Sequence, residues 1–175
     1  MKGFLLRAAR VGDIDALLEV ERRAASLLLD HGGYDLLAMH SLASHDLEQG
    51  ILHGILELAE VAGQVVGFAL CGEVDGQAHL FEIDVLPEHG RSGIGSALLE
   101  SVCHTARARG WMQMTLITLR DVPWNGPFYK MRGFVELQER EHGMQLAAIV
   151  AREQGLGLPA RLRVVMRRRC APAGC

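Results

Sequence analysis

The sequence predicts an α/β fold of the α+β type, in which a mixed, mostly antiparallel sheet is flanked by helices. Residues 55–86 have the spacing of three strands, and the turns Ala62-Gly63-Gln64 and Asp75-Gly76 link them into an antiparallel meander. Residues 92–109 then form the clearest helix, with Gly110 at its C-terminal cap position. One face of this helix is apolar and consists of Ile94, Ala97, Leu98, Val102 and Ala106.

The remaining elements follow from apolar periodicity and from capping residues. Before the meander we expect a strand at 4–7, a helix with Asp13 as its N-cap, a break at 31–34 and a less regular helix at 44–53. After the long helix we expect a strand at 112–119, a short helix at 125–132, a strand at 134–138, a helix at 143–154 and a last strand at 161–168.

The composition is that of an ordinary globular domain and excludes disorder as the main description. The chain has 175 residues, of which 49% are hydrophobic and 22% charged, so we expect one domain over 1–169 and a short, disordered tail over 170–175. The longest apolar run, 65–71, is too short to cross a bilayer, and Arg7 interrupts the apolar start before a signal sequence can develop. A cytoplasmic protein that binds no membrane is expected.

Charge and residue spacing restrict the partners. Residues 41–90 contain nine acidic side chains and no Lys or Arg, whereas 91–140 contain seven basic and four acidic ones. This asymmetry suits a cation in one region and an anion in the other. The net charge of −3 argues against nucleic acid as a partner. The Cys and His spacings match no metal site, and the four cysteines fit a reduced compartment.

The segment 81–99 is the most informative about chemistry. A strand leads to a turn that contains Gly93 and Gly95 and opens directly into the long helix. Backbone N–H groups at a helix start are unpaired, so this turn, with Arg91 beside it, suits a phosphate or a diphosphate. A P-loop is excluded because no Lys is near, and a dinucleotide fingerprint is disfavoured because Leu98 replaces its third glycine. A tight turn that binds no ligand is the remaining alternative.

Several segments in this order resemble the GNAT superfamily of acyl-CoA-dependent N-acetyltransferases over nearly the whole chain. Residues 10–17 are similar to the start of that family, 63–69 to its strand-turn-strand, and 83–99 to its CoA motif. Residues 125–134 resemble its second motif in the form of the Asn-x-Pro-Phe-Tyr subgroup. The resemblance implies the GNAT fold with a V-shaped opening for acetyl-CoA. It also implies direct acetyl transfer to an amine in a ternary complex, with no metal.

The resemblance implies a coenzyme site on the strand, the turn and the helix start. The backbone of 83–85 would bind the pantetheine arm, and the N–H of Val85 would polarise the thioester carbonyl. Gly90 stands where the family has Gln or Arg, but its N–H can still bind phosphate. The implied cofactor-binding residues are Ile83, Asp84, Val85, Gly90, Arg91, Ser92, Gly93, Ile94, Gly95, Ser96 and Asn125.

Two catalytic residues are implied. Tyr129 would give its proton to the CoA thiolate, which is feasible because phenol and thiol pKa values lie at about 10 and 8.5. Glu82 and Asp84 share one face of their strand, and either could accept the amine proton. Glu82 is preferred, because it lies further from the phosphate turn. His79 is a second candidate, for which a structural role is expected.

The acceptor is expected along 27–53 and 140–159. The side chains of Asp30, Asp35, Asp46 and Glu48 would make the first of these walls acidic. A cationic primary amine is therefore favoured, such as a polyamine, an aminoglycoside-like amine or a lysine side chain. The alternatives are a non-catalytic acyl-CoA-binding regulatory module and an acetyltransferase for protein N-termini or lysines. A homodimer is left open.

Overall fold

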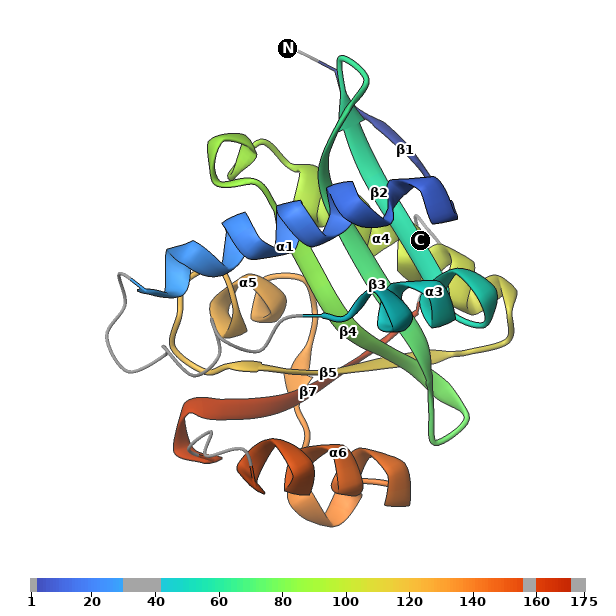
Figure 1. The fold of residues 1–175 in the computed structure, drawn as a ribbon. Coiled ribbons are helices and arrows are strands. Elements are labelled where there is room, and N and C mark those ends of the chain that lie inside the picture. The colour runs from blue at the N-terminus through green and yellow to red at the C-terminus, as the bar shows by residue number, and fades with distance from the viewer. Residues whose placement is uncertain (1–2, 30–41, 156–159, 171–175) are drawn as a thin grey trace. The chain divides into compact units, whose positions relative to one another are not determined.

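The computed structural model describes residues 3–29, 42–155 and 160–170, which fall into two compact units. The first unit comprises the chain up to Gly72 together with Phe81–Thr105. The second comprises Glu73–Leu80 and the chain from Ala106 onward. Strand β4 (Gln77–Val85) passes from the second unit into the first. Figure 1 labels the elements along the ribbon.

The strands are hydrogen-bonded in the order β1-β2-β3-β4-β5-β7-β6. Strand β2 runs antiparallel to β1 and β3, and β7 runs antiparallel to β5 and β6. Strand β4 pairs in parallel with β5 through Ala78–Leu80 and Met114–Leu116. A mixed, mostly antiparallel sheet flanked by helices confirms the predicted fold class. The other strands are β1 (Leu5–Ala8), β2 (Ile55–Val61), β3 (Gln64–Val74), β5 (Gln113–Leu119), β6 (Val135–Glu136) and β7 (Arg163–Arg169).

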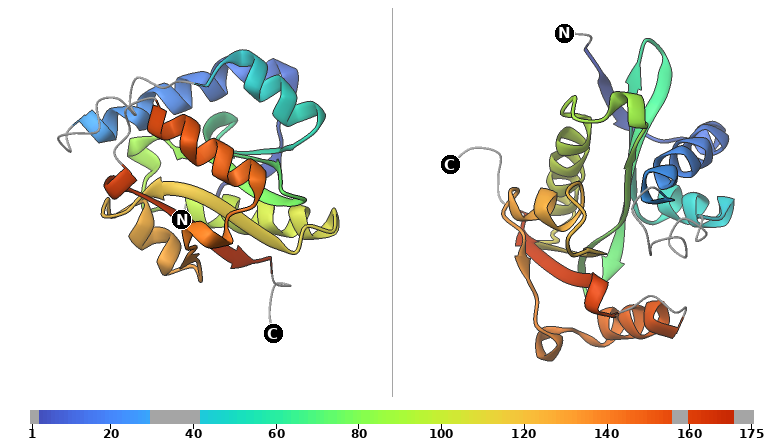
Figure 2. Two further views of the ribbon diagram at one scale, coloured as in Figure 1. Left: turned by 90° about the horizontal axis from the view of Figure 1, so that it is seen from below. Right: turned by 90° about the vertical axis from the view of Figure 1, so that its left-hand side faces the viewer.

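In the first unit, helices cover both faces of the strands. Helices α1 (Ile14–Leu29) and α3 (Ser44–Leu52) lie on one face, and α4 (Ile94–Ala108) lies on the other (Figure 2). Helix α4 has the expected apolar face, although Ala97 is only half-buried. It begins two residues later than predicted, because Gly93 has a φ of +89°, which is not helical. Its buried residues include Ile94, Leu98, Leu99, Val102, Cys103 and Ala106.

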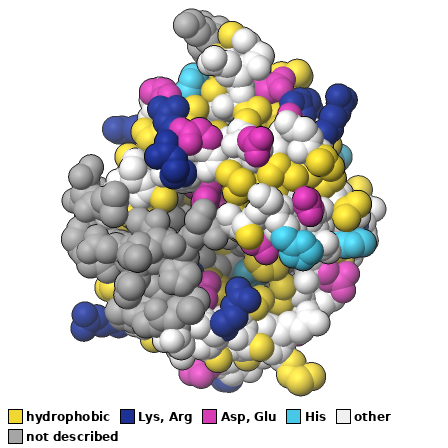
Figure 3. Space-filling view, viewed as in Figure 1, with side chains coloured by type: hydrophobic (Ala, Val, Ile, Leu, Met, Phe, Trp, Pro, Cys, Tyr) yellow, Lys and Arg dark blue, Asp and Glu magenta, His cyan; other side chains and the backbone are white. Residues whose placement is uncertain are grey.

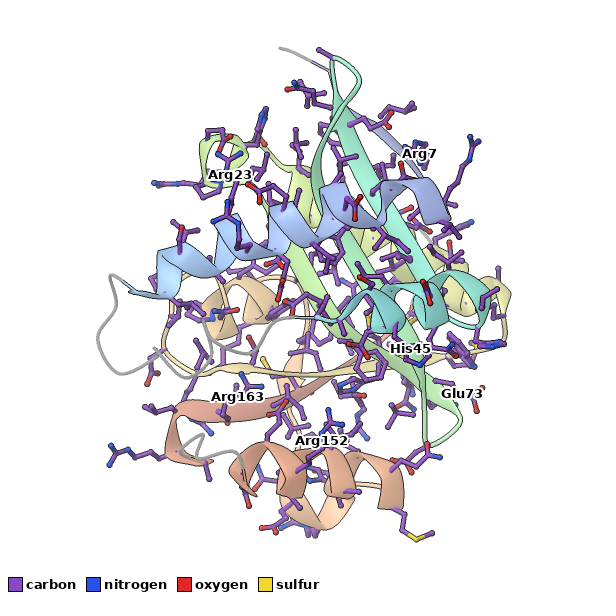
Figure 4. The ribbon with its side chains drawn as sticks, in the orientation of Figure 1. Arg7, Arg23, His45, Glu73, Arg152 and Arg163 are labelled. Atoms are coloured by element: carbon purple, nitrogen blue, oxygen red, sulfur yellow. The ribbon has the colours of Figure 1, made fainter. Side chains whose placement is uncertain are left out.

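Asp13 does not cap α1, contrary to the prediction. It ends a 3₁₀ turn, Val11–Asp13, and its Oδ2 accepts the N–H of Arg10 at 2.8 Å. The guanidinium of Arg7 donates to both oxygens of Asp13, at 2.7 and 2.8 Å, and to Glu60 at 2.6 Å (Figure 4 labels Arg7). The carboxylate therefore stabilises the turn before the helix, and α1 starts at Ile14. The expected break at 31–34 lies outside the described residues.

In the second unit, α6 (Met144–Gly155) packs against β7 through a small apolar cluster. Arg163 of β7 also donates to Glu153 of α6 at 2.7 Å. The short helix before β6 is α5 (Gly126–Lys130). The cluster consists of Val74, Leu137, Leu146 and Val165, with Ile117, Ile149 and Val150 packed on it.

Two strands of the second unit are shorter than the sequence predicts. The N–H of Phe134 donates to Tyr129 O at 3.2 Å, so the expected strand at 134–138 is reduced to the two residues of β6. A 3₁₀ turn occupies Ala160–Leu162, so β7 begins at Arg163 rather than 161.

No disulfide links the cysteines of the described residues. Cys71 and Cys103 are buried, which confirms them as core residues. Cys170 is also buried, and its N–H donates to Met112 O at 2.9 Å, while 171–175 lie outside the described residues. Within the parts of the chain that the structure describes, no helix is both long and apolar enough to span a membrane.

Candidate functional site

The turn between β4 and α4 presents backbone donors to solvent. A 3₁₀ turn over Pro87–His89 is followed by Arg91, which has a φ of +59°, and by Gly93. A Cβ at Gly93 would meet no atom within 4 Å, so the space above it is free within the described residues. Because α4 starts at Ile94, the N–H groups of its first turn have no carbonyl partner in the helix. This arrangement is suited to an anion.

Helix α1 is tied to this turn by an ion pair. The guanidinium of Arg23 donates to Glu88 Oε1 at 2.7 Å, and both side chains are exposed (Figure 4 labels Arg23). An exposed pair contributes about 0–1 kcal/mol. The pair links α1 to the turn and adds little to the stability of the fold.

Three carboxylates approach one another in the first unit. Burial, and then the charges of Glu82 and Glu21, raise the pKa of Asp84 well above its ordinary value. Asp84 and Glu82 lie on one face of β4, and Glu21 comes from the buried side of α1. Because the raised pKa lets Asp84 retain a proton, the negative potential at the strand that leads to the glycine turn comes from the carboxylates of the cluster that stay ionised.

Glu21 was not among the predicted site residues. Its side chain is 5% exposed, and its Oε1 accepts the N–H of Leu42 at 3.0 Å. The signal was present in the sequence, because Glu21 occupies a position on the apolar face of a predicted helix. A buried carboxylate needs hydrogen bonds or nearby charges to be tolerated, and such a position is a functional candidate.

The acidic wall expected from the sequence is only partly present. Asp30 and Asp35 lie outside the described residues. Asp46 accepts the N–H of Ala43 at 2.8 Å, so its carboxylate serves the first turn of α3. Glu48 is exposed and lies 4.0 Å from His45. Acidic and histidine side chains share this surface (Figure 3), and Figure 4 labels His45.

The second unit carries Tyr129 and Asn125. Tyr129 is buried in α5, and its ring packs edge-on against Phe128 and Phe134, with centroids 5.1 and 5.5 Å away. Its N–H donates to Asn125 O at 3.0 Å, which fixes the first turn of α5. The side-chain oxygen of Asn125 accepts the hydroxyl of Thr118 at 3.0 Å. These ring contacts and hydrogen bonds hold Tyr129 in place within α5.

An ion network holds the other end of α5. Glu136 of β6 accepts from Lys130 and from Arg120, both at 2.9 Å. The hydrogen bonds from Lys130 and Arg120 lower the pKa of Glu136 below its ordinary value. Lys130 thus ties the end of α5 to β6, and Arg120 ties β6 to the residue that directly follows β5.

His79 has a structural environment. It is 3% exposed, and its Nδ1 lies 2.8 Å from the hydroxyl of Thr115. Burial lowers its pKa to about 4. His79 is neutral at physiological pH, as expected for a packed histidine. Among the described residues, no three His, Cys, Asp or Glu side chains are arranged to hold a metal ion.

The predicted site residues are divided between the two units. Glu82, the strand segment 83–85 and the turn 90–96 belong to the first unit, and Asn125 and Tyr129 to the second. Each set is locally ordered by hydrogen bonds within its own unit. The structural roles of Glu21 and Thr118 are additions to the sequence-based prediction.

Comparison with known proteins finds a matching domain and similar folds. Residues 53–136 match the model of the acetyltransferase (GNAT) domain. The fold is similar to that of PaiA N-acetyltransferase from Thermoplasma acidophilum in complex with coenzyme A (16% identity, 95% of this chain and 99% of that chain, TM-score 0.73). It is also similar to the ribosomal-protein-S18-alanine N-acetyltransferase from Escherichia coli (19% identity, 98% of this chain and 97% of that chain, TM-score 0.66).

A third similar structure is N-acetylglutamate synthase from Neisseria gonorrhoeae complexed with coenzyme A and N-acetyl-glutamate. The identity is 20%, the TM-score is 0.71, and the match covers 98% of this chain but 36% of that chain. The matched region contains the strand-turn-helix segment at 81–99, which includes β4 and the start of α4. Residues 53–136 of the chain thus match the acetyltransferase (GNAT) domain, and the chain has the fold of the GNAT N-acetyltransferases.

Proposed function

We propose that the protein transfers an acetyl group from acetyl-CoA directly to a cationic primary amine. The observation that carries the amine class is the carboxylate cluster of Glu21, Glu82 and Asp84. An ammonium group gains from this negative potential, whereas an acidic acceptor is repelled. The similar PaiA and N-acetylglutamate synthase structures contain coenzyme A, which supports acetyl-CoA as the donor.

The coenzyme is proposed to bind along β4 and the turn before α4. The backbone of 83–85 would pair with pantetheine, and the N–H of Val85 would stabilise the oxyanion. The N–H groups of 91–96, with the side chain of Arg91, would hold the diphosphate. The N–H of Gly90, which was expected to bind phosphate, instead donates to Pro87 O at 3.0 Å. Asn125 is proposed as a further donor to the coenzyme.

The proton transfers are assigned to Glu82 and Tyr129. The acceptor must lose a proton before it attacks, because an ammonium group has no lone pair and its pKa is about 10. A carboxylate near other carboxylates is a stronger base than an isolated one, which favours the cluster for this step. The carbon–nitrogen bond forms as the carbon–sulfur bond of the thioester breaks, and Tyr129 gives its proton to the leaving CoA thiolate. The nitrogen then loses its second proton, which returns through solvent to the tyrosinate.

The test is acetylation of a panel of amines, followed by product mass because the four cysteines would react with a thiol reagent. Polyamines, an aminoglycoside and a lysine peptide should be acetylated faster than glutamate, and preference for glutamate would contradict the cationic acceptor. Tyr129→Phe should retain CoA affinity and lose turnover, and Glu82→Gln should lower kcat at neutral pH. Binding of CoA without turnover of any amine would instead favour a regulatory module.

A further inference from the structure

Asn125 occupies the N-cap position of α5 but does not cap it. Asparagine at this position ordinarily accepts a backbone N–H of the first turn through Oδ1. In this protein its side chain makes no such bond. The reason lies in the next residues, because Pro127 has no N–H and removes one of the donors that a cap would satisfy. The side-chain amide is therefore available for another purpose.

Thr118 fixes the direction of that amide. Its hydroxyl donates to Asn125 Oδ1 at 3.0 Å, and Thr118 is 5% exposed within the β5–β7 pairing. The main chain of Asn125 is also fixed, since its N–H donates to Val122 O at 2.9 Å and its carbonyl accepts from Tyr129. With the backbone and Oδ1 both held, Nδ2 can point in one direction only.

The amide nitrogen Nδ2 is the polar group of Asn125 that remains to be considered. Within the described residues it has no hydrogen-bond partner, and Asn125 is half-buried rather than buried. An amide NH₂ can donate two hydrogen bonds. An oriented donor that faces no protein acceptor is suited to an acceptor oxygen on a ligand.

We propose that Thr118 is a positioning residue for coenzyme binding, which it serves by holding Asn125 so that Nδ2 donates to an oxygen of CoA. The inference rests on the proposed function, because it assigns the ligand of Asn125 to the coenzyme. The acceptor oxygen belongs either to a pantetheine carbonyl or to a phosphate. Thr118 itself touches no substrate.

The experiment measures the dissociation constant for CoA by calorimetry at one salt concentration. Thr118→Val keeps the side-chain shape and removes the hydroxyl, so Asn125 is free to turn toward its own helix. The constant should rise about threefold to tenfold, which is the loss of one oriented hydrogen bond. Thr118→Ser should restore the wild-type value within about twofold.

A double-mutant cycle separates positioning from general damage. Asn125→Ala should weaken CoA binding, and adding Thr118→Val to it should produce no further loss. Thr115→Val is the matched control on the same strand, because its hydroxyl bonds His79 and not Asn125. It should leave CoA affinity unchanged.

Coenzyme fragments identify the acceptor oxygen. If Thr118→Val also weakens the binding of pantetheine, the acceptor oxygen lies on the pantetheine arm. If it weakens the binding of only adenosine 3′,5′-bisphosphate or CoA, the acceptor oxygen lies on a phosphate. Wild-type binding of CoA with an unchanged Thr118→Val constant would overturn this inference alone, as would an equal loss in the Asn125→Ala background. Absence of CoA binding by the wild type would overturn the proposed function and this inference with it.

Discussion

Asp75 and Gln145, which are 70 positions apart in the sequence, form two reciprocal hydrogen bonds. Asp75 Oδ1 accepts the N–H of Gln145 at 2.9 Å, and the N–H of Asp75 donates to Gln145 Oε1 at 2.6 Å. Asp75 Oδ2 also accepts the N–H of Leu146 at 3.0 Å. The turn between β3 and β4 thus caps the start of α6, as an N-cap residue within the same helix would do.

Asp75→Ala should therefore destabilise the protein by about 1–2 kcal/mol, which is the usual cost of losing a helix cap. Chemical denaturation measures the change. Asp75→Asn is the matched control, because asparagine keeps one acceptor and tolerates the φ of +51° at this position. It should lose less than the alanine variant. Equal losses in the two variants would contradict a capping role for the Asp75 carboxylate.

The sequence was sufficient for most elements of the fold, but not for contacts of this kind. Apolar periodicity predicts β2 with the bounds that the structure has, and residue types alone identify the Asp75-Gly76 turn and Gly110, because these signals are local. The cap of α6 was not predictable, because its donor and acceptor residues become neighbours only after folding. The prediction for Asp13 was wrong because the side chain of Arg7 and the N–H of Arg10, both on its N-terminal side, bind its carboxylate.

The candidate site was predictable to a similar degree. The glycine turn and Tyr129 lie in sequence motifs, so the sequence alone is enough to name them. Glu21 and Thr118 could not be named in this way, because each acts on a residue that is distant or belongs to another element: Glu21 on Leu42 and Asp84, and Thr118 on Asn125. A Glu on an apolar helix face was visible in the sequence, but its partners were not.

His79 should make stability depend on pH in the acid range. Its folded-state pKa of about 4 lies below the ordinary value of 6.5, so the unfolded chain binds the proton first. Stability is therefore fully present above pH 6.5 and is lost as the pH falls toward 4. The loss attributable to His79 should reach about 2 kcal/mol at pH 5.

Denaturation at pH 7 and pH 5 measures this loss. In His79→Gln the difference between the two pH values should shrink by about 2 kcal/mol, even if the variant is less stable at both. An exposed histidine provides the control, and His45→Gln should keep the wild-type difference. An undiminished difference in His79→Gln would show that His79 is not the group responsible.

Gly126 brings α5 against the end of β5. A Cβ at this position would clash with Arg120 O, which is backbone and cannot move aside easily. Gly126→Ala should displace α5, which carries Tyr129, and cost at least about 1–3 kcal/mol of stability. Turnover should fall more than CoA affinity, because Tyr129 is assigned to the chemical step.

Gly155→Ala is the matched control for Gly126→Ala. A Cβ at Gly155 would meet no atom within 4 Å, and the residue ends α6, so alanine should be neutral or slightly stabilising. Thermal unfolding and steady-state kinetics on both variants check the comparison. Equal behaviour of the two variants would mean that the close approach at Arg120 does not constrain α5.

Asp84 should oppose folding as the pH rises. Its pKa is raised by burial and by the charges of Glu82 and Glu21, so the folded state retains a proton that the unfolded chain has released. Its favourable contribution is present below the unfolded pKa of about 3.9 and is lost as the pH rises through the folded value. Asp84→Asn cannot ionise, so the variant should gain stability relative to wild type as the pH increases from 5 to 8.

The measurement is the difference in unfolding free energy between variant and wild type at each pH, in which the contribution of His79 cancels. Asp121→Asn, at an exposed position, should show a constant difference. A constant difference for Asp84→Asn as well would mean that the carboxylate cluster does not hold a proton in the folded protein.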